Sequence, residues 1–416
     1  MGKANAMSED HSRQKPRKKI SKRQNPNILK DLLHKKISRR DFIKYSIYAG
    51  VSIGAFALLK DLFISSKKET AKMGPEELKQ GMREAMFYET RGDTVYCQLC
   101  PNQCILNNNM TGVCRVRKNI NGILYTLVYG SVCAAHNDPI EKKPFFHFLP
   151  GTRVFSIATV GCNMHCLNCQ NWSISQASPG DVETRHLGPK DVIEQAKLSN
   201  SKIIAYTYTE PTIFYEFMHD TAQVAHQEGL KNVIISNGYI NQEPLKKISK
   251  LIDGANIDLK GFDKDVLMKL TGGNLPDILR SIKQYKEEGI WVEITNLIVP
   301  SYTDDLKKIE ELCDWIKKNL GEDVPLHFSR FHPQYKLTNL PPTPVETLKR
   351  AREIALKKGL SYVYIGNVPG NEFEDTYCPN CNKKIIERQG YLVQKPKIKD
   401  GKCEYCGERI EGVWSF

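Results

Sequence analysis

The chain has 416 residues, of which 40% are hydrophobic and 26% are charged, so it is neither a disordered chain nor a membrane protein with many spans. Its net charge is +13, but +11 of that charge lies in residues 1–70 and the remainder is nearly neutral. A basic leader of this kind is weak evidence for nucleic-acid binding, and no nucleic-acid partner is expected. The length predicts about two to three domains.

The leader has the layout of an export signal. Arg39 and Arg40 lie in a basic stretch that resembles the twin-arginine signal, and an uncharged stretch over 45–59 follows it. No small-residue cleavage site follows Leu59, so residues 45–59 are a candidate membrane anchor. The alternative is a basic tail on a protein that stays in the cytoplasm. The chain is therefore expected to be exported or anchored in a membrane, with the cytoplasm as the alternative location.

Eleven of the thirteen cysteines fall in three tight clusters, and only Cys133 and Cys313 stand alone. A small disulfide scaffold would be far shorter, so clustered cysteines with short spacings predict metal ligation. The clusters and the leader divide the chain into four predicted segments. These are a basic leader over 1–70, a Cys-rich region over 75–150, a core over 151–370 and a C-terminal four-cysteine segment over 371–416.

The core alternates apolar runs with helical patterns. The expected strands are 153–160, 203–208, 232–236, 255–259, 291–299, 326–331 and 362–365. The helix expected over 304–320 has an apolar face that includes Cys313, which is therefore predicted to be a core residue. Strands that alternate with helices predict an α/β fold with a parallel sheet, either open or closed as a barrel. In such barrels the chemistry lies at the C-terminal ends of the strands.

The central cysteines follow the first expected strand of the core. Cys162, Cys166 and Cys169 have the spacing C-x3-C-x2-C, with no fourth cysteine nearby. Three thiolates on a 4Fe-4S cluster leave one iron without a protein ligand, and an open position is typical of a catalytic metal centre. The alternative is an ordinary zinc site.

A strand, this cysteine motif and an α/β domain together resemble the radical S-adenosylmethionine (SAM) superfamily. The resemblance implies a partial (β/α)6-type TIM barrel and a 4Fe-4S cluster on the three cysteines. It also implies reductive cleavage of SAM to a 5′-deoxyadenosyl radical that abstracts hydrogen. The departure is Asn168, where the family usually has an aromatic residue that contacts the adenine side of SAM.

Four signals further along the chain match SAM-binding stretches of radical SAM activases, each after a predicted strand. The matched residues are Glu210, then Ser236 and Asn237, then Asp258 and Lys260, and finally His332. The resemblance implies that these residues bind the cofactor. The first three have ordinary structural alternatives: a helix start at Glu210, a turn at Asn237, and a charge pair at the end of a strand for Asp258 and Lys260. Their common order behind the cysteine motif favours the cofactor interpretation.

Two further clusters flank the core. Cys97, Cys100, Cys104 and Cys114 suit zinc or an iron–sulfur cluster, with disulfides as a third possibility if the chain is exported. The C-terminal cluster consists of Cys378, Cys381, Cys403 and Cys406. Its two C-x2-C pairs, 21 residues apart, predict a zinc-ribbon-like site.

One branch of the superfamily is similar over roughly residues 90–416. The runs 137–144, 147–151 and 169–172 resemble the radical SAM enzyme of the AmmeMemoRadiSam system, a branch similar to the pyruvate formate-lyase activating enzyme. The resemblance implies an enzyme that acts on a protein target and uses a low-potential electron donor. The target is a glycyl-radical enzyme or, alternatively, a Memo-like or AMMECR-like protein or a small molecule. An alternative of another class is a non-catalytic, metal-stabilised module that binds nucleic acid or protein.

Overall fold

The computed structural model describes residues 81–370 and 372–416. The predicted leader, with its paired arginines and the apolar stretch over 45–59, lies outside the described residues. In the described part of the chain, none of the helices combines the length and the apolar character that a membrane span requires.

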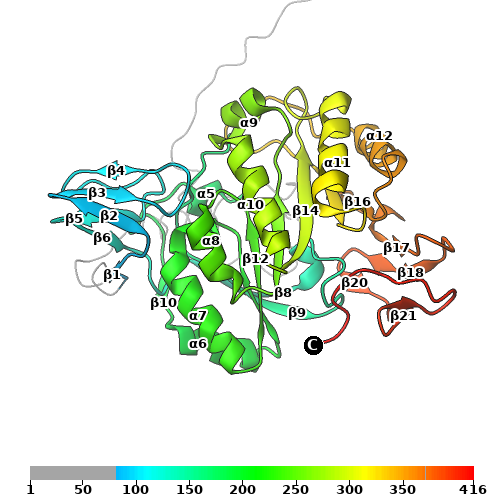
Figure 1. The fold of residues 1–416 in the computed structure, drawn as a ribbon, viewed down its shortest axis with the longest axis horizontal. Helices are drawn as coiled ribbons and strands as arrows, with labels where there is room; N and C mark the ends of the chain where they lie inside the picture. The colour runs from blue at the N-terminus through cyan, green and yellow to red at the C-terminus, as the bar shows by residue number, and fades with distance from the viewer. Residues whose placement is uncertain (1–80, 371) are drawn as a thin grey trace, which may run out of the picture. The chain divides into compact units, whose positions relative to one another are not determined.

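An eight-stranded sheet forms the centre of the core (Figure 1). Its order is β16-β15-β14-β13-β12-β11-β9-β8, and every neighbouring pair from β9 to β16 is parallel. The parallel strands are β9 (Arg153–Ala158), β11 (Ile203–Tyr206), β12 (Lys231–Ser236), β13 (Gly254–Asp258), β14 (Trp291–Ile298), β15 (Leu326–Arg330) and β16 (Val363–Gly366). All seven strands were expected, with ends that differ by one or two residues. The strands at the two ends of the order do not pair, so the sheet is open and the predicted α/β class is confirmed.

The eighth strand, β8 (Ala134–Pro139), is an addition that the sequence pattern did not predict. It pairs antiparallel with β9 at the edge of the sheet. Its sequence, AAHNDP, has no β-branched or aromatic residue and ends in proline, so β-propensity gives no signal there. Tertiary pairing with β9 decides its conformation.

Helices connect the parallel strands. They are α6 (Pro189–Leu198), α7 (Tyr215–Gln227), α8 (Gln242–Ser249), α9 (Lys264–Thr271), α10 (Leu275–Glu287), α11 (Leu306–Leu320) and α12 (Val345–Lys357). The Asp305 side chain accepts a hydrogen bond from Lys307 N and so caps the first turn of α11. Cys313 is fully buried on the inner face of α11, which confirms it as a core residue.

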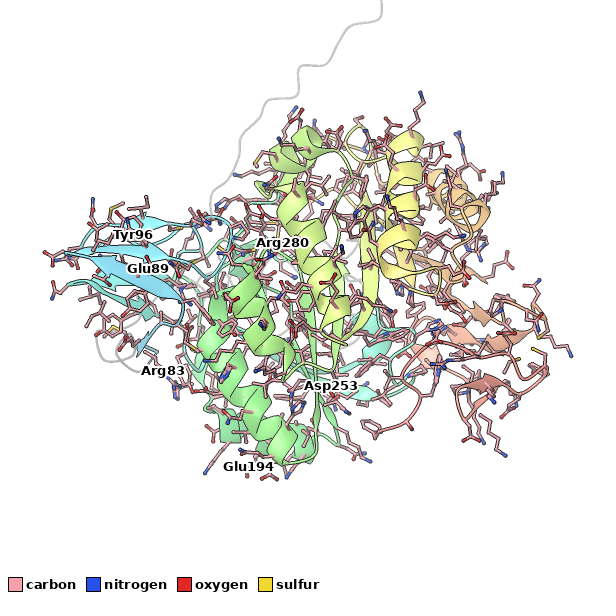
Figure 2. All side chains as sticks on the ribbon, in the orientation of Figure 1. Arg83, Glu89, Tyr96, Glu194, Asp253 and Arg280 are labelled. Atoms are coloured by element: carbon pink, nitrogen blue, oxygen red, sulfur yellow. The ribbon has the colours of Figure 1, made fainter. Side chains whose placement is uncertain are left out.

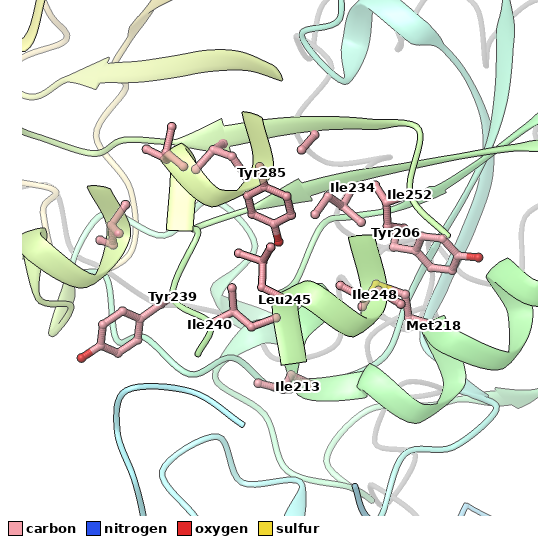
Figure 3. Close-up of a cluster of buried hydrophobic side chains, with 14 of the residues drawn as sticks. Tyr206, Ile213, Met218, Ile234, Tyr239, Ile240, Leu245, Ile248, Ile252 and Tyr285 are labelled. Carbon is pink, nitrogen blue, oxygen red and sulfur yellow. The ribbon is translucent and has the colours of Figure 1, made fainter. Parts of the chain in front are cut away.

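The core lies between the sheet and these helices. Figure 3 shows Tyr206 and Ile234 from the strands packed with Leu245 of α8 and Tyr285 of α10. All four are at most 2% exposed. Each buried side chain of this size contributes about 1.5–3 kcal/mol of burial free energy, so this layer fixes the strand ends to which the candidate site is attached.

The Cys-rich region forms two small sheets instead of isolated loops. One consists of β2 (Tyr88–Arg91), β3 (Thr94–Cys97) and β4 (Ile105–Leu106). The other consists of β1 (Arg83–Glu84), β5 (Arg117–Ile120) and β6 (Ile123–Thr126). Glu89 and Tyr96 lie opposite each other on β2 and β3 (Figure 2). A further short pair joins β7 (Ser131–Val132) to β10 (Arg185–His186). These strands hold the N-terminal cysteines in place.

The C-terminal segment consists of three two-stranded hairpins. Their strands are β17 (Thr376–Tyr377), β18 (Lys384–Ile386), β19 (Arg388–Gln389), β20 (Leu392–Val393), β21 (Ile398–Lys399) and β22 (Lys402–Cys403). Phe146, Tyr362 and Tyr364 pack with two of its cysteines in one buried cluster. The segment is therefore packed on the core at the β16 side of the sheet (Figure 1).

Candidate functional site

The cysteine loop begins at the C-terminal end of β9. Gly161, immediately before the first cysteine, has φ of +100°. A Cβ atom there would lie 2.7 Å from the Cys114 carbonyl oxygen and 2.7 Å from Val116 Cγ1, so a larger residue would clash. Glycine therefore lets the central loop pass close against the Cys-rich region.

Several hydrogen-bonding groups lie close to the sulfur atoms of this loop. Cys162 Sγ lies 3.4 Å from Met164 N and 3.8 Å from Asn237 Nδ2, and Cys169 Sγ lies 3.1 Å from Ser175 Oγ. Cys162 and Cys169 are half-buried and Cys166 is buried. Donors around half-buried sulfurs are typical of iron–sulfur ligands, whose potentials they tune.

Glu210, the first predicted cofactor stretch, is hydrogen-bonded to the second, which consists of Ser236 and Asn237. Its Oε1 accepts from Ser236 Oγ at 2.8 Å, and its Oε2 accepts from Asn237 N at 2.9 Å. Thr212 adds two more bonds to Oε1, from its N at 3.0 Å and its Oγ1 at 2.7 Å. Burial raises the pKa of Glu210, and these donors oppose the rise. Glu210, Ser236 and Asn237 thus form one buried unit beside Cys162.

Asn163 is a residue that the sequence analysis missed. Its Oδ1 accepts from Asn237 Nδ2 at 2.9 Å, and its own Nδ2 donates to Tyr239 O at 2.7 Å. It ties the cysteine loop to the loop after β12. In the sequence, the signal for a role of Asn163 at the site was its position between Cys162 and Cys166.

Asp258 is the last residue of β13 and Lys260 follows the strand, and the two form an ion pair of 2.8 Å. Burial opposes the charge on Lys260, but Asp258 and the nearby Cys166 raise its pKa above the usual value. A cation held beside the cysteine loop can compensate the negative charge of thiolates. The structure therefore places Lys260 of this predicted pair near Cys166 and Cys169.

His332 lies apart from that buried unit, in an exposed loop after β15. It lines a cavity of about 440 Å³ together with Asn168 of the cysteine loop. Leu297, Arg330 and Tyr391 also line this cavity, so residues from β14, β15 and the C-terminal segment share it. Asn168 Oδ1 is buried without a hydrogen-bond partner, so an acceptor is available next to Cys169.

Glu141 is a second residue that the sequence analysis missed, in a run for which the residues alone gave no chemical role. It belongs to the short helix η1 (Ile140–Lys142), lines the same cavity and is 3% exposed. Its Oε1 accepts from Gly151 N at 2.7 Å, while Oε2 has no partner. Burial raises the pKa of Glu141 to about 7, against the field of Arg388.

We expect Glu141→Gln to become more stable relative to the parent as pH rises from about 4.5 to 7. The folded state keeps the Glu141 proton in this window and the unfolded state loses it, so the stability of the parent falls with rising pH. Glutamine retains an acceptor for Gly151 N and cannot ionise. Urea denaturation at a series of pH values checks this, with Glu194→Gln on the exposed face of α6 (Figure 2) as the control. Parallel pH profiles of Glu141→Gln and the parent would contradict the expectation.

The C-terminal cysteines have the spacing of a single-ion site. Cys378 Sγ lies 3.6 Å from Cys406 Sγ, and Cys381 Sγ lies 3.9 Å from Cys403 Sγ. All four sulfurs lie within 4.8 Å of one another. Four thiolates about 2.3 Å from one zinc would be about 3.8 Å apart. Among residues 81–370 and 372–416, this is the only group of three or more Cys, His, Asp or Glu side chains whose ligand atoms all lie within 4.8 Å of one another.

The other two clusters are more widely spaced. Neither the three central thiols nor the four N-terminal thiols form such a group within the described residues. A cluster of several iron and sulfide atoms holds its cysteine ligands farther apart than one ion does. The central cysteines therefore lack the sulfur spacing of a mononuclear zinc site.

Comparison with known proteins adds independent findings. A protein-family model described as Radical SAM superfamily matches residues 156–316. The uncharacterized protein MJ0808 of Methanocaldococcus jannaschii is 50% identical over 335 residues, which are 80% of this chain and 100% of that protein. The pyruvate formate-lyase 1-activating enzyme of Escherichia coli K12 is 24% identical over 50% of this chain and 91% of its own length. A solved domain of the pyruvate-formate lyase-activating enzyme from Bacteroides vulgatus matches 39% of this chain and 98% of its own, with 18% identity and a TM-score of 0.36.

Proposed function

The chain belongs to the radical SAM superfamily of enzymes, and from this premise we propose that it cleaves SAM and transfers the radical to a protein target. The observation that carries the proposal is the convergence at the strand ends. The cysteine loop, the Glu210 unit and the Asp258–Lys260 pair come from β9, β11, β12 and β13. Asn237 of the Glu210 unit donates toward Cys162, and Lys260 lies close enough to Cys166 for the charge of that thiol to raise the lysine pKa. This is the edge where α/β folds of this type perform their chemistry.

Cys162, Cys166 and Cys169 would hold the 4Fe-4S cluster, which when bound supplies the electron that cleaves SAM to a 5′-deoxyadenosyl radical. The residues of the chain provide the environment. Lys260 places positive charge beside Cys166, and Asn237 donates toward Cys162. Glu210 fixes the backbone of the loop after β12 through Asn237 N. Since its carboxylate already accepts four bonds within the chain, we assign it a positioning role toward the methionyl part of SAM.

The cavity that contains Asn168 and His332 is the proposed entry for the target. A volume of about 440 Å³ accommodates a short peptide loop or a small molecule. Two relatives are named for activating other enzymes, pyruvate formate-lyase and 4-hydroxyphenylacetate decarboxylase, which favours a protein target. We propose a glycyl-radical enzyme as that target. The alternative target is a Memo-like partner or a small molecule, which would enter through the same cavity.

The test uses the full chain, purified anaerobically and reconstituted with iron and sulfide. We expect dithionite and SAM together to give 5′-deoxyadenosine, and the omission of either to give none. A Cys313→Ala chain, altered at a core cysteine outside all three clusters, should retain this product. The reconstituted chain could hold the cluster and show a change in the cluster spectrum on SAM binding, yet form no product. That result would contradict unassisted cleavage. Deuterium transfer from labelled candidate targets then identifies the hydrogen donor.

We also propose that the C-terminal cysteines hold one structural zinc ion. Their sulfur spacing supports a closed tetrahedral site, and their buried contacts with Tyr362 and Tyr364 join that site to the core. We expect about one zinc per chain and its loss in Cys378→Ser. Elemental analysis after anaerobic dialysis measures both. Zinc that stays bound in the variant would contradict the assignment.

A further inference from the structure

The N-terminal cysteines surround a small cavity of their own. Cys97 ends β3, Cys100 and Cys104 lie between β3 and β4, and Cys114 lies before β5. All four line a cavity of about 20 Å³, together with Arg117 and apolar side chains. Cys97, Cys100 and Cys114 are buried and Cys104 is half-buried.

The size of this cavity argues against one metal ion. Sulfurs that surround a single zinc touch one another at about 3.8 Å and leave no room between them for a water-sized sphere. A cavity of about 20 Å³ exceeds the roughly 10–15 Å³ that one water needs. The N-terminal thiols also fail the 4.8 Å criterion that the C-terminal thiols satisfy within the described residues. The spacing fits an occupant of several atoms.

Arg117 supplies an unused donor at this cavity. The residue is buried, and its Nη1 donates to Glu216 Oε1 at 2.9 Å. Its Nε is buried and has no hydrogen-bond partner. A buried N–H group without a partner costs free energy, so Arg117 Nε can serve as the donor to a polar group bound in this cavity. A sulfide or thiolate in the cavity provides an acceptor, and the guanidinium charge compensates the negative charge of the ligands.

This site lies directly against the central loop. Asn102 Nδ2 donates to Asn163 O at 2.8 Å, within the loop that carries the central cysteines. Gly161 leaves room for the Cys114 carbonyl, as described above. A substitution in one cysteine set can therefore disturb the other set, so the test must distinguish the metal bound by the N-terminal cysteines from that bound by the central ones.

We propose that Cys97, Cys100, Cys104 and Cys114 bind a second iron–sulfur cluster, distinct from the central one. Four thiolates complete its ligand set, so it has no open iron position. The proposal is independent of the proposed SAM chemistry, because it concerns only what these four residues bind.

The test uses the full chain with Cys162→Ala, Cys166→Ala and Cys169→Ala combined, which removes the central ligands. After anaerobic reconstitution with iron and sulfide, we expect bound iron and sulfide with the Mössbauer spectrum of a cluster, and about one zinc per chain. Absence of iron with zinc near two per chain would overturn the proposal in favour of zinc. Absence of both metals at this site, with the loss of four titratable thiols, would overturn it in favour of disulfides.

A matched pair of changes locates the cluster. Adding Cys100→Ser and Cys104→Ser to the triple variant should abolish the remaining iron, whereas adding Cys133→Ser and Cys313→Ser should leave it in place. Iron that survives the first pair would overturn the assignment to these residues. If Cys100→Ser and Cys104→Ser prevent folding, the Mössbauer spectrum of the reconstituted parent chain decides. Two cluster components in that spectrum support the proposal, and one component overturns it.

Discussion

The Cys162→Ala chain is expected to form no 5′-deoxyadenosine under conditions in which the parent forms it. Alanine removes one of three thiolates from the central loop, and two ligands do not hold a cluster with a single open position. Cys162 is also the sulfur that Asn237 and Met164 N approach, so its loss leaves both donors without their partner. Anaerobic reconstitution followed by quantification of the nucleoside measures the effect.

Cys133→Ala is the matched control for this prediction. Cys133 is half-buried next to β8, and its Sγ is 3.5 Å from the Ala158 carbonyl at the end of β9. Its removal therefore disturbs the same strand without touching the thiols of the loop. Equal circular dichroism spectra of the two variants exclude unfolding as the cause. Product formation by Cys162→Ala at the parental rate would refute the assignment of the central cysteines.

The Glu216→Ala chain is expected to lose about 3–5 kcal/mol of unfolding free energy, because the change leaves a buried charge without its partner. Glu216 on α7 pairs with Arg117 on β5 at 2.9 Å, and both side chains are 2% exposed. Glu216 Oε1 also accepts from Met86 N at 2.7 Å. Burial opposes the charge of Arg117, but Glu216 raises its pKa above the usual value. Anaerobic urea denaturation of the metal-loaded chain measures the loss.

Two further variants test the cause. Glu194→Ala removes an exposed carboxylate from α6 and should change stability by less than about 0.5 kcal/mol. Arg117→Met combined with Glu216→Leu removes both charges and should recover much of the lost stability, since apolar replacements of a buried pair are often tolerated. A double variant as unstable as Glu216→Ala would show that packing, and not the unpaired charge, dominates.

The pair also connects the Cys-rich region to the core. Arg83 on β1, which is labelled in Figure 2, makes a second ion pair between that region and α7, with Asp220. Tyr129 donates to the same carboxylate at 2.8 Å. The region is thus attached to the core through charges and hydrogen bonds that lie far apart in the sequence. Periodicity within a short strand contains no information about such partners.

Much of the core was predictable because its signals are local. Buried parallel strands appear as continuous apolar runs, and α11 has the 3.6-residue period of an amphipathic helix. The cysteine spacing and the residues after each strand likewise lie in short segments. Parallel topology then requires their C-terminal ends to meet at one edge. Glu210, Asn237 and Asp258 were chosen because they match SAM-binding stretches of radical SAM activases, and their positions after predicted strands agree with this topology.

The sequence by itself determined the strand–helix alternation, the three cysteine groups and the candidate residues at the strand ends, since each depends on neighbours within a few residues. Only the tertiary structure decided that β8 extends the sheet, that Glu141 and Asn168 share a cavity, and that Asn163 joins two loops. It also separated the close C-terminal sulfurs from the wider N-terminal group within the described residues. Spacing along a chain limits which cysteines can meet, whereas the distance between sulfurs follows from how strands and helices far apart in sequence pack together.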